Sequence, residues 1–187
     1  MRTAADVEIH TVPHQQLTDQ MLDQLKELFD REYFSEHGAW NPELPYGYAP
    51  HDVHLIARSG TALIGHVGWA RRDIAVGPHE LTVAGVGGVL VSPAGRGRRL
   101  GRRLMDAARR SMLDHDDIEF GYLGCDESVV PFYASCGWRR IAAPERWVDC
   151  EGNEAASPPG PPLLILPLRG RAEDWPEGEI DLRGRAW

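Results

Sequence analysis

The sequence has little of what marks several large classes of protein. No apolar run in its 187 residues approaches the roughly 18 that a membrane-spanning helix needs. The three cysteines (Cys125, Cys136 and Cys150) are odd in number and lack metal-ligand spacing, so we expect neither a disulfide framework nor a zinc site. The first residues contain no apolar block, so we expect no signal peptide and a soluble, cytoplasmic protein.

Lysine is also nearly missing, since Lys26 stands alone and the other 19 basic residues are arginines. The net charge of −8 argues against general nucleic-acid binding. Residues 1–50 carry three basic and nine acidic residues, whereas residues 96–110 carry seven arginines and one acid. This asymmetry indicates two binding surfaces of opposite sign, or else two solvated faces.

The length and the apolar fraction of 42% fit one globular domain over residues 1–187. Periodicity predicts strands at 7–12, 53–58, 62–74, 81–91, 118–123, 138–148 and 163–168, and helices at 18–32, 97–113 and 128–135. We interpret 33–50 as a loop, 151–162 as a flexible loop and 169–187 as a polar C-terminal tail. The order predicts an α/β fold with a mixed, mostly antiparallel central sheet flanked by helices.

Arginines and glycines crowd the junction between a long strand and the following helix. Five arginines fall within residues 96–103, although the free N–H groups of a helix start already carry positive potential. A bound polyanion explains them, because backbone N–H groups can cradle phosphates while guanidinium groups close around them. Gly95, Gly97 and Gly101 would let the backbone approach closely. The alternative is a solvated basic face or a nucleic-acid patch.

The segment Arg96-Gly97-Arg98-Arg99-Leu100-Gly101 resembles the acyl-CoA signature R-G-x-G-x-G/A of the GNAT superfamily of N-acyltransferases, with Arg99 in place of one glycine. The predicted order of elements is also that of this superfamily. The resemblance implies the GNAT fold and acetyl-CoA as cosubstrate, its pantetheine lying along strand residues 86–91. The cofactor contacts that it implies are Val89, Val91, Arg96, Gly97, Arg98, Arg99, Leu100 and Gly101.

A second segment, Pro131-Phe132-Tyr133-Ala134-Ser135-Cys136-Gly137-Trp138, resembles the (F/L)-Y-x-x-x-G-(F/W) block of the superfamily. This resemblance makes Tyr133 the general acid near the CoA sulfur, where a proton donor eases expulsion of the thiolate. From its spacing alone, Tyr133 would be a core aromatic. Gly87-Gly88 predicts a bulge that splays the sheet and lets the N–H near Val89 polarise the thioester carbonyl, with tight packing as the alternative.

The general base is poorly marked. The aminoglycoside acetyltransferases, which this chain resembles through residues given below, carry a glutamate in the fourth strand, and the resemblance puts Gly87 at that position here. We prefer Asp126, because it follows the end of a buried strand, where catalytic groups often lie. The other candidates are Glu80, Glu127, His66, His79 and the terminal carboxylate of Trp187, and the histidines favour a structural role. Cys125 and Cys136 are interpreted as small hydrophobic residues, since no His/Asp arrangement supports a nucleophile.

Within the superfamily, the chain is most similar to the aminoglycoside 2′-N-acetyltransferases, through Tyr133-Ala134-Ser135-x-Gly137-Trp138 and the ending in Trp187. It is less similar to the nodulation-factor N-acyltransferases, through Arg71-Arg72-x-Ile74-x-Val76-Gly77 and Asp174-Trp175-Pro176-x-Gly178. The first resemblance implies acetyl transfer to an amine of an aminoglycoside-type amino sugar, for antibiotic resistance or self-protection, by a homodimer. The alternatives are a longer acyl donor or another amine, and a non-catalytic module that binds CoA or a drug.

Residues 32–50 hold five of the 15 aromatic residues and three glutamates. Aromatic faces stack on sugar rings and carboxylates hold ammonium groups, so we expect Glu36, Trp40 and Trp187 to contact the acceptor. The alternative is that these aromatics pack on the core. Arg185 would repel a polycation, which favours an acceptor that is less cationic or that carries its own carboxylate, as kasugamycin-type aminoglycosides do.

Overall fold

Strand β3 (Ala62–Val76) is the centre of the fold in the computed structural model, which describes residues 6–187. It pairs antiparallel with β4 (His79–Val91) along most of its length, with β2 (Val53–Ser59) over its first half and with β10 (Ile180–Arg185) at its end. The first five residues, on which the expectation about a signal peptide rests, lie outside the described part of the chain.

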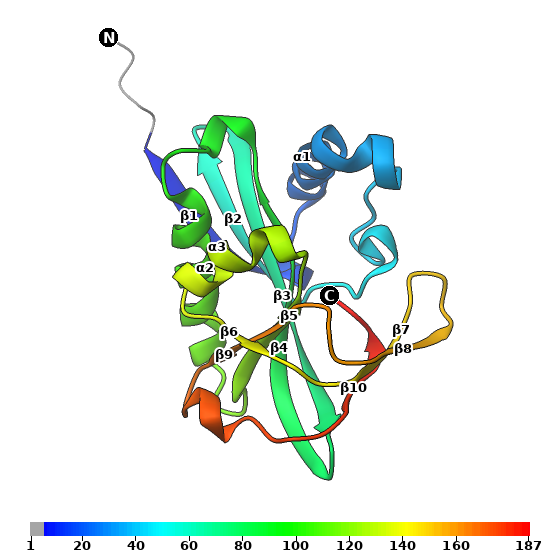
Figure 1. Cartoon of the computed structure of the whole chain (residues 1–187). Helices are drawn as coiled ribbons and strands as arrows, with labels where there is room; N and C mark the ends of the chain where they lie inside the picture. The colour runs from blue at the N-terminus through cyan, green and yellow to red at the C-terminus, as the bar shows by residue number, and fades with distance from the viewer. Residues whose placement is uncertain (1–5) are drawn as a thin grey trace.

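One mixed sheet contains the strands of residues 6–187, with the order β6-β9-β5-β4-β3-β10-β7-β8 and with β1 beside β2 (Figure 1). The remaining strands are β1 (Val7–Pro13), β5 (Phe120–Gly124), β6 (Arg139–Ile141), β7 (Glu145–Val148), β8 (Glu154–Ser157) and β9 (Leu163–Pro167). Only β4–β5 and β7–β10 are parallel pairs, so the expected α/β fold with a mostly antiparallel sheet is confirmed.

The two longer helices cover opposite faces of the sheet. The side chain of Thr18 caps α1 (Asp19–His37) by accepting a hydrogen bond from the N–H of Met21. Helix α1 packs through Phe29 and its neighbours against Ile56 and Leu90 on one face, whereas α2 (Leu100–Leu113) packs with Leu55 and Ala57 on the other. Successive strand residues point to opposite faces, which explains why Leu55 and Ile56 belong to different cores.

The sheet opens between β4 and β5, and this opening positions the site. Their parallel pairing spans only Val83–Gly85 opposite Phe120–Tyr122. Further along β4 the register to β3 shifts by one residue, so that Gly88 and Val89 lack partners and Gly88 has a φ of 58°. The bulge predicted at Gly87-Gly88 is therefore confirmed. Helix α3 (Val130–Ser135) lies across the opening (Figure 1), and Gly137, with a φ of 92°, follows its end.

Several predicted boundaries were wrong. Helix α1 continues to His37, so Tyr33, Phe34 and Glu36 are helical rather than in a loop. Helix α2 begins at Leu100 rather than at residue 97. The strand predicted at 138–148 divides into β6 and β7, with Pro144 between them. Part of the supposed flexible loop 151–162 forms β8, and part of the supposed tail 169–187 forms β10, where Ile180 and Leu182 are fully buried.

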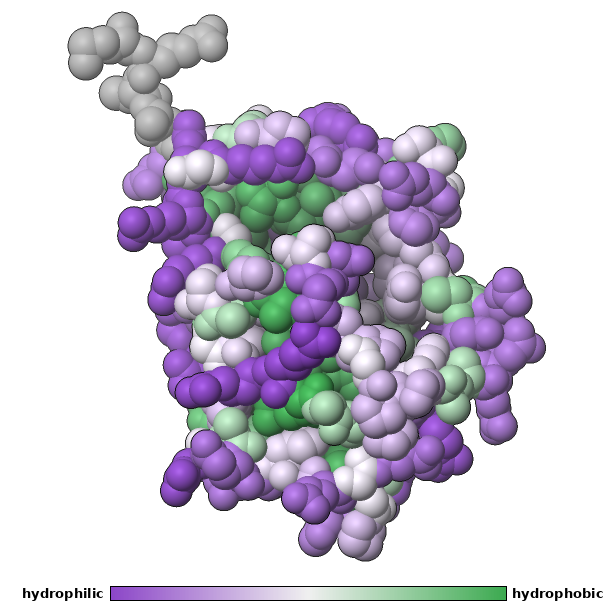
Figure 2. Space-filling model, in the orientation of Figure 1, coloured by the Kyte–Doolittle hydropathy of each residue, from purple (hydrophilic) through white to green (hydrophobic). Residues whose placement is uncertain are grey.

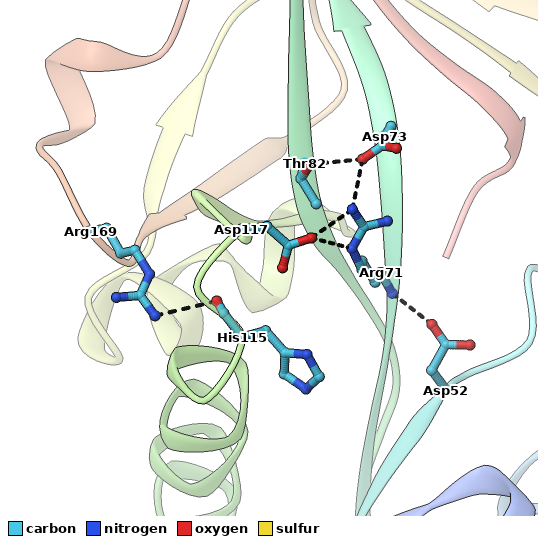
Figure 3. Close-up of polar contacts among 7 residues, drawn as sticks. All are labelled: Asp52, Arg71, Asp73, Thr82, His115, Asp117 and Arg169. Carbon is cyan, nitrogen blue, oxygen red and sulfur yellow. Dashed lines mark hydrogen bonds and ion pairs between the residues drawn. The ribbon is translucent and has the colours of Figure 1, made fainter.

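Ion pairs hold β3 to the loops at its edge (Figure 3). The Arg71 guanidinium donates to Asp117, which follows α2, and lies 3.4 Å from a carboxylate oxygen of Asp73. The Arg71 backbone N–H donates to the Asp52 carboxylate over 2.8 Å, which anchors the segment before β2. Among residues 6–187, no helix combines the length and apolar character needed to cross a membrane.

Candidate active site

A groove of about 910 Å³ lies between the end of β4, the turn before α2, and α3. Figure 2 shows hydrophobic residues on the floor of a hollow beneath a hydrophilic rim in this part of the molecule. Apolar side chains of the strand end and α3 face cationic residues of the turn. The lining residues are Val89, Val91, Gly95, Arg96, Gly97, Arg99, Leu100, Gly101, Arg102, Val129, Phe132, Tyr133 and Ser135.

The turn and the start of α2 contribute three arginines to the groove. Arg96, Arg99 and Arg102 line it, and Arg99 adopts the left-handed conformation with a φ of 54°. Arg98, which we also expected here, is exposed and is not among the residues that line the groove. Arg103 donates to the backbone oxygen of Val7 and ties α2 to β1.

The backbone of this turn suits an extended polyanion. Gly97, with a φ of 77°, has open space where a β-carbon would lie, so its backbone is accessible to a ligand on that side. The first turn of α2 contains no acidic residue, and no side chain caps its N–H groups. Free N–H groups, three guanidinium groups and an apolar groove beyond them fit a molecule with phosphates at one end and an apolar arm at the other.

A second cavity, of about 290 Å³, continues from the groove between α1, β4 and the C-terminal residues. Its lining is dominated by rings, and Trp40 and Trp187 belong to it as expected. The lining residues are Phe29, Tyr33, His37, Trp40, Pro45, Tyr46, Tyr48, His51, Val86, Gly87, Gly88, Val89, Gly124, Cys125, Tyr133 and Trp187. No carboxylate side chain of the described residues lines this cavity, so Glu36, which we expected to contact the acceptor, is not among its lining residues.

Tyr133 and Val89 line both cavities and therefore stand where the two meet. Tyr133 is buried in α3, and burial raises the pKa of its phenol above the usual value, so the proton stays on oxygen at neutral pH. Val89 follows the bulge and has no Cα partner on β3 or β5. The junction therefore brings together the protonated Tyr133 hydroxyl and Val89, a strand residue without a paired neighbour on β3 or β5.

His51 is the titratable group that the sequence analysis missed. Its ring lies over Gly68 and Gly87, which are paired across β3 and β4, and a β-carbon on Gly68 would be 2.3 Å from the ring. Burial lowers the pKa of His51 to about 3, so the imidazole is neutral and keeps a lone pair. Asp52 fixes the segment through its backbone and its carboxylate, which accepts from Arg71 (Figure 3). The one sequence signal was the spacing His51-x-x-His54 in a segment otherwise interpreted as the end of a loop.

The structure does not bring Asp126 into either cavity. Asp126 is exposed, caps the turn before α3 by accepting from the N–H of Ser128, and has its pKa lowered by that contact. Glu80 pairs with Arg183 and Glu127 with Arg140, so these acids are also placed elsewhere. Burial raises the pKa values of Cys125 and Cys136, which disfavours the thiolate form and agrees with a non-nucleophilic role.

Trp187 closes one side of the second cavity. Its ring lies on Gly85, where a β-carbon would come within 1.9 Å of it, and the Arg72 guanidinium lies over the ring, 4.0 Å from its centre. Arg185, which we expected to repel a cationic acceptor, donates instead to the backbone oxygens of Gly47 and Asp149. Its charge holds two loops together, and it does not line the cavity.

Comparisons with known proteins agree with this geometry. The family model described as Nodulation protein A (NodA) matches residues 4–185. The N-alpha-acetyltransferase RimI of Mycobacterium tuberculosis is 32% identical over 120 residues, which cover 63% of this chain and 69% of RimI. The family model thus matches the resemblance to the nodulation-factor N-acyltransferases, which the sequence analysis gave as the weaker of the two. The similarity to aminoglycoside 2′-N-acetyltransferases stays a prediction.

Solved structures share the fold at low sequence identity. The GNAT family N-acetyltransferase YhbS of Escherichia coli, in complex with CoA, has a TM-score of 0.64 and 16% identity over 97% of this chain and 92% of its own. E. coli ElaA has a TM-score of 0.61 and 19% identity over 85% of this chain and 99% of its own. These structures establish the GNAT fold that the sequence predicted.

Proposed function

The chain belongs to the NodA family and has the fold of the GNAT N-acyltransferases, and on this premise we propose that it transfers an acetyl group from acetyl-CoA to the primary amine of an amino sugar. The observation that carries the proposal is the continuity of the two cavities. A groove with a cationic turn at one end meets an aromatic cavity at Tyr133 and Val89. A donor and an acceptor can therefore meet at a single point without leaving their sites.

The groove fits acetyl-CoA by charge and by shape. Arg96, Arg99 and Arg102, with the N–H groups of the turn, would hold the pyrophosphate. The pantetheine arm would follow the strand end from Val91 to Val89, beside the apolar face of Phe132. On this path the thioester would lie at the junction, where Val89 and Tyr133 line both cavities.

Three groups of this chain then have distinct roles in acyl transfer. The Val89 N–H would donate to the thioester oxygen as negative charge develops on it. The neutral imidazole of His51 would accept the proton that the amine loses when its nitrogen attacks the carbonyl carbon. The Tyr133 phenol would give its proton to the departing sulfur, which keeps the leaving thiolate from reversing the reaction.

The second cavity narrows the class of acceptor. Its volume of about 290 Å³ is at the small end of ligand pockets, and its walls are rings rather than carboxylates. Trp40, Tyr46 and Trp187 each carry a buried polar atom with no hydrogen-bond partner. Rings that stack on a sugar face, together with unused polar atoms, favour one amino-sugar ring rather than a whole polycationic aminoglycoside.

An acceptor panel tests this proposal by following thiol release from acetyl-CoA and the mass of the product. We expect turnover with hexosamines or amine-bearing oligosaccharides, including aminoglycosides that present one accessible ring. Longer acyl-CoA donors belong in the same panel. If the enzyme prefers them to acetyl-CoA, the transferred group is a longer acyl chain and not acetyl. Binding of CoA without turnover on any amine would reduce the protein to a CoA-binding module.

A protein α-amine is the second candidate acceptor, favoured by the 32% identity to an N-alpha-acetyltransferase. Peptides with a free N-terminus therefore belong in the panel beside the sugars. The aromatic cavity accommodates only a short end of a peptide, so we expect the sugars to give the larger kcat/KM. A larger kcat/KM with peptides would make the protein α-amine, and not the amino sugar, the preferred acceptor.

A further inference from the structure

A chain of hydrogen-bonded histidines crosses the sheet from the surface to the bulge. Nε2 of His14 lies 3.1 Å from the Glu43 carboxylate, and Nδ1 of His14 lies 3.1 Å from Nε2 of His54. Nδ1 of His54 lies 2.9 Å from Nε2 of His66, and Nδ1 of His66 lies 2.7 Å from the backbone oxygen of Gly88. His54 and His66 are fully buried, whereas Glu43 is exposed.

The inner end of the chain fixes its direction. A carbonyl oxygen only accepts, so Nδ1 of His66 carries the proton and donates to Gly88. The other nitrogen of a neutral His66 then accepts, which makes His54 a donor to His66 and an acceptor from His14. Each donor thus points inward, and His14 can donate from both nitrogens when it is protonated and paired with Glu43.

The carbonyl at the end of this chain belongs to the peptide group that carries the Val89 N–H. A hydrogen bond to the oxygen of a peptide group withdraws electron density and makes its N–H a stronger donor, and successive hydrogen bonds polarise one another. We propose that the chain from Glu43 through His14, His54 and His66 positions and polarises the Gly88–Val89 peptide, so that the Val89 N–H stabilises the developing oxyanion. These histidines are positioning residues, because they touch the peptide and not the reacting atoms. The inference rests on the proposed function.

Two other roles for these histidines fit less well. A proton cannot leave the cavity through the chain, because its inner end is a carbonyl oxygen and not a group that exchanges protons. His51 is near His54 and His66, with ring centres 5.8 Å apart, but no hydrogen bond joins it to either. A metal site does not account for them, since the described residues contain no group of three His, Cys, Asp or Glu side chains arranged to hold an ion.

His54→Phe tests the proposal, because phenylalanine keeps a ring in the core and interrupts the chain. We expect kcat to fall about tenfold with KM for acetyl-CoA unchanged, a part of the roughly 10²–10³ lost with a whole oxyanion donor. The amide proton of Val89 should shift upfield in the NMR spectrum of the free protein, as its hydrogen-bond polarisation weakens. This second readout needs no turnover, so it separates failure of the inference from failure of the proposed function.

His14→Ala and His10→Ala complete the experiment. His14 is half-buried at the outer end, so its loss should leave the fold intact and give a smaller change in the same direction, about threefold in kcat. His10 is an exposed histidine outside the chain, and its variant should match the wild type. If His54→Phe is too unstable, His14→Ala alone decides. An unchanged Val89 amide shift and an unchanged kcat in the folded variants would overturn the inference.

Discussion

The imidazole of His51 lies against the α-carbon of Gly87, with its Nε2 2.9 Å from the point that a β-carbon on Gly87 would occupy. The strand position at which the sequence resemblance led us to expect an acid therefore has no room for a side chain while His51 occupies its present place. A neutral nitrogen base from a different segment occupies the same space, beside the junction of the two cavities. The absence of a side chain at Gly87 leaves room for the His51 imidazole, which we propose as the base.

His51→Asn should lower kcat about 10²-fold, because asparagine cannot take a proton from the attacking amine. KM for acetyl-CoA should change little, since His51 lines the second cavity and not the groove. Steady-state kinetics with both substrates varied checks this. His79→Asn is the matched control, since His79 is exposed and lines neither cavity. Full activity in His51→Asn would show that His51 is not the base.

Tyr133→Phe should lower kcat about 10²-fold or more and leave acetyl-CoA binding intact, because only the proton donor is removed. Burial raises the pKa of Tyr133, so the wild-type rate should show no alkaline fall from this phenol up to at least pH 10. Calorimetry of CoA binding and a pH–rate profile measure the two effects. Tyr48→Phe, at an exposed tyrosine on the rim of the second cavity, should retain most of its kcat.

The sequence predicted the parts of the site that are contiguous in the chain. The cationic turn, Tyr133 in its short helix and the bulge at Gly87-Gly88 each depend on neighbours within a few residues. His51 was not predictable in this way, because its place depends on Gly68 and Gly87 meeting across two strands. The spacing of residues along one strand does not determine which residue of a distant strand it pairs with.

The fold followed the same rule. Helices and strands with strong apolar periodicity were predicted, whereas β10 was not, because only Ile180 and Leu182 of its six residues are apolar. It becomes a strand by inserting between β3 and β7, a tertiary effect that outweighs its weak local pattern. The ending of α1 was misplaced because Tyr33 and Phe34 were interpreted as loop aromatics, although the helix continues until Gly38, with a φ of 75°.

Arg99 combines a left-handed backbone with a side chain on the groove, and two substitutions separate these properties. Arg99→Gly and Arg99→Ala both remove the guanidinium, so both should raise KM for acetyl-CoA roughly tenfold. Only alanine keeps a β-carbon at a φ of 54°, so the glycine variant should be more stable by about 1 kcal/mol. Urea denaturation and steady-state kinetics measure the two differences. Arg98→Ala, outside the groove lining, should leave KM unchanged, and a KM rise equal to that of the Arg99 variants would contradict this assignment.

Three buried histidines should make the protein sensitive to mild acid. Burial lowers the pKa values of His51, His54 and His66 to about 3, 2 and 4, from an ordinary value of 6.5 in the unfolded chain. Below pH 6.5 the unfolded chain therefore binds protons that the native protein does not, and the free energy of unfolding falls as the pH falls. Between pH 6.5 and 5.5 the loss should be about 1 kcal/mol for each histidine, or about 3 kcal/mol together.

Carboxylates do not account for this acid sensitivity. The lowered pKa values of Asp126 and Asp149 place their titration below this window. Burial raises the pKa of Glu145, so that residue opposes the loss by taking up its proton in the native state first. Urea midpoints at pH 6.5 and 5.5 measure the change. His54→Phe should reduce it by about a third, because one of the three histidines whose pKa is lowered in the native protein is removed. A midpoint independent of pH over this range would mean that the three imidazoles are protonated, or accessible to solvent, in the native protein.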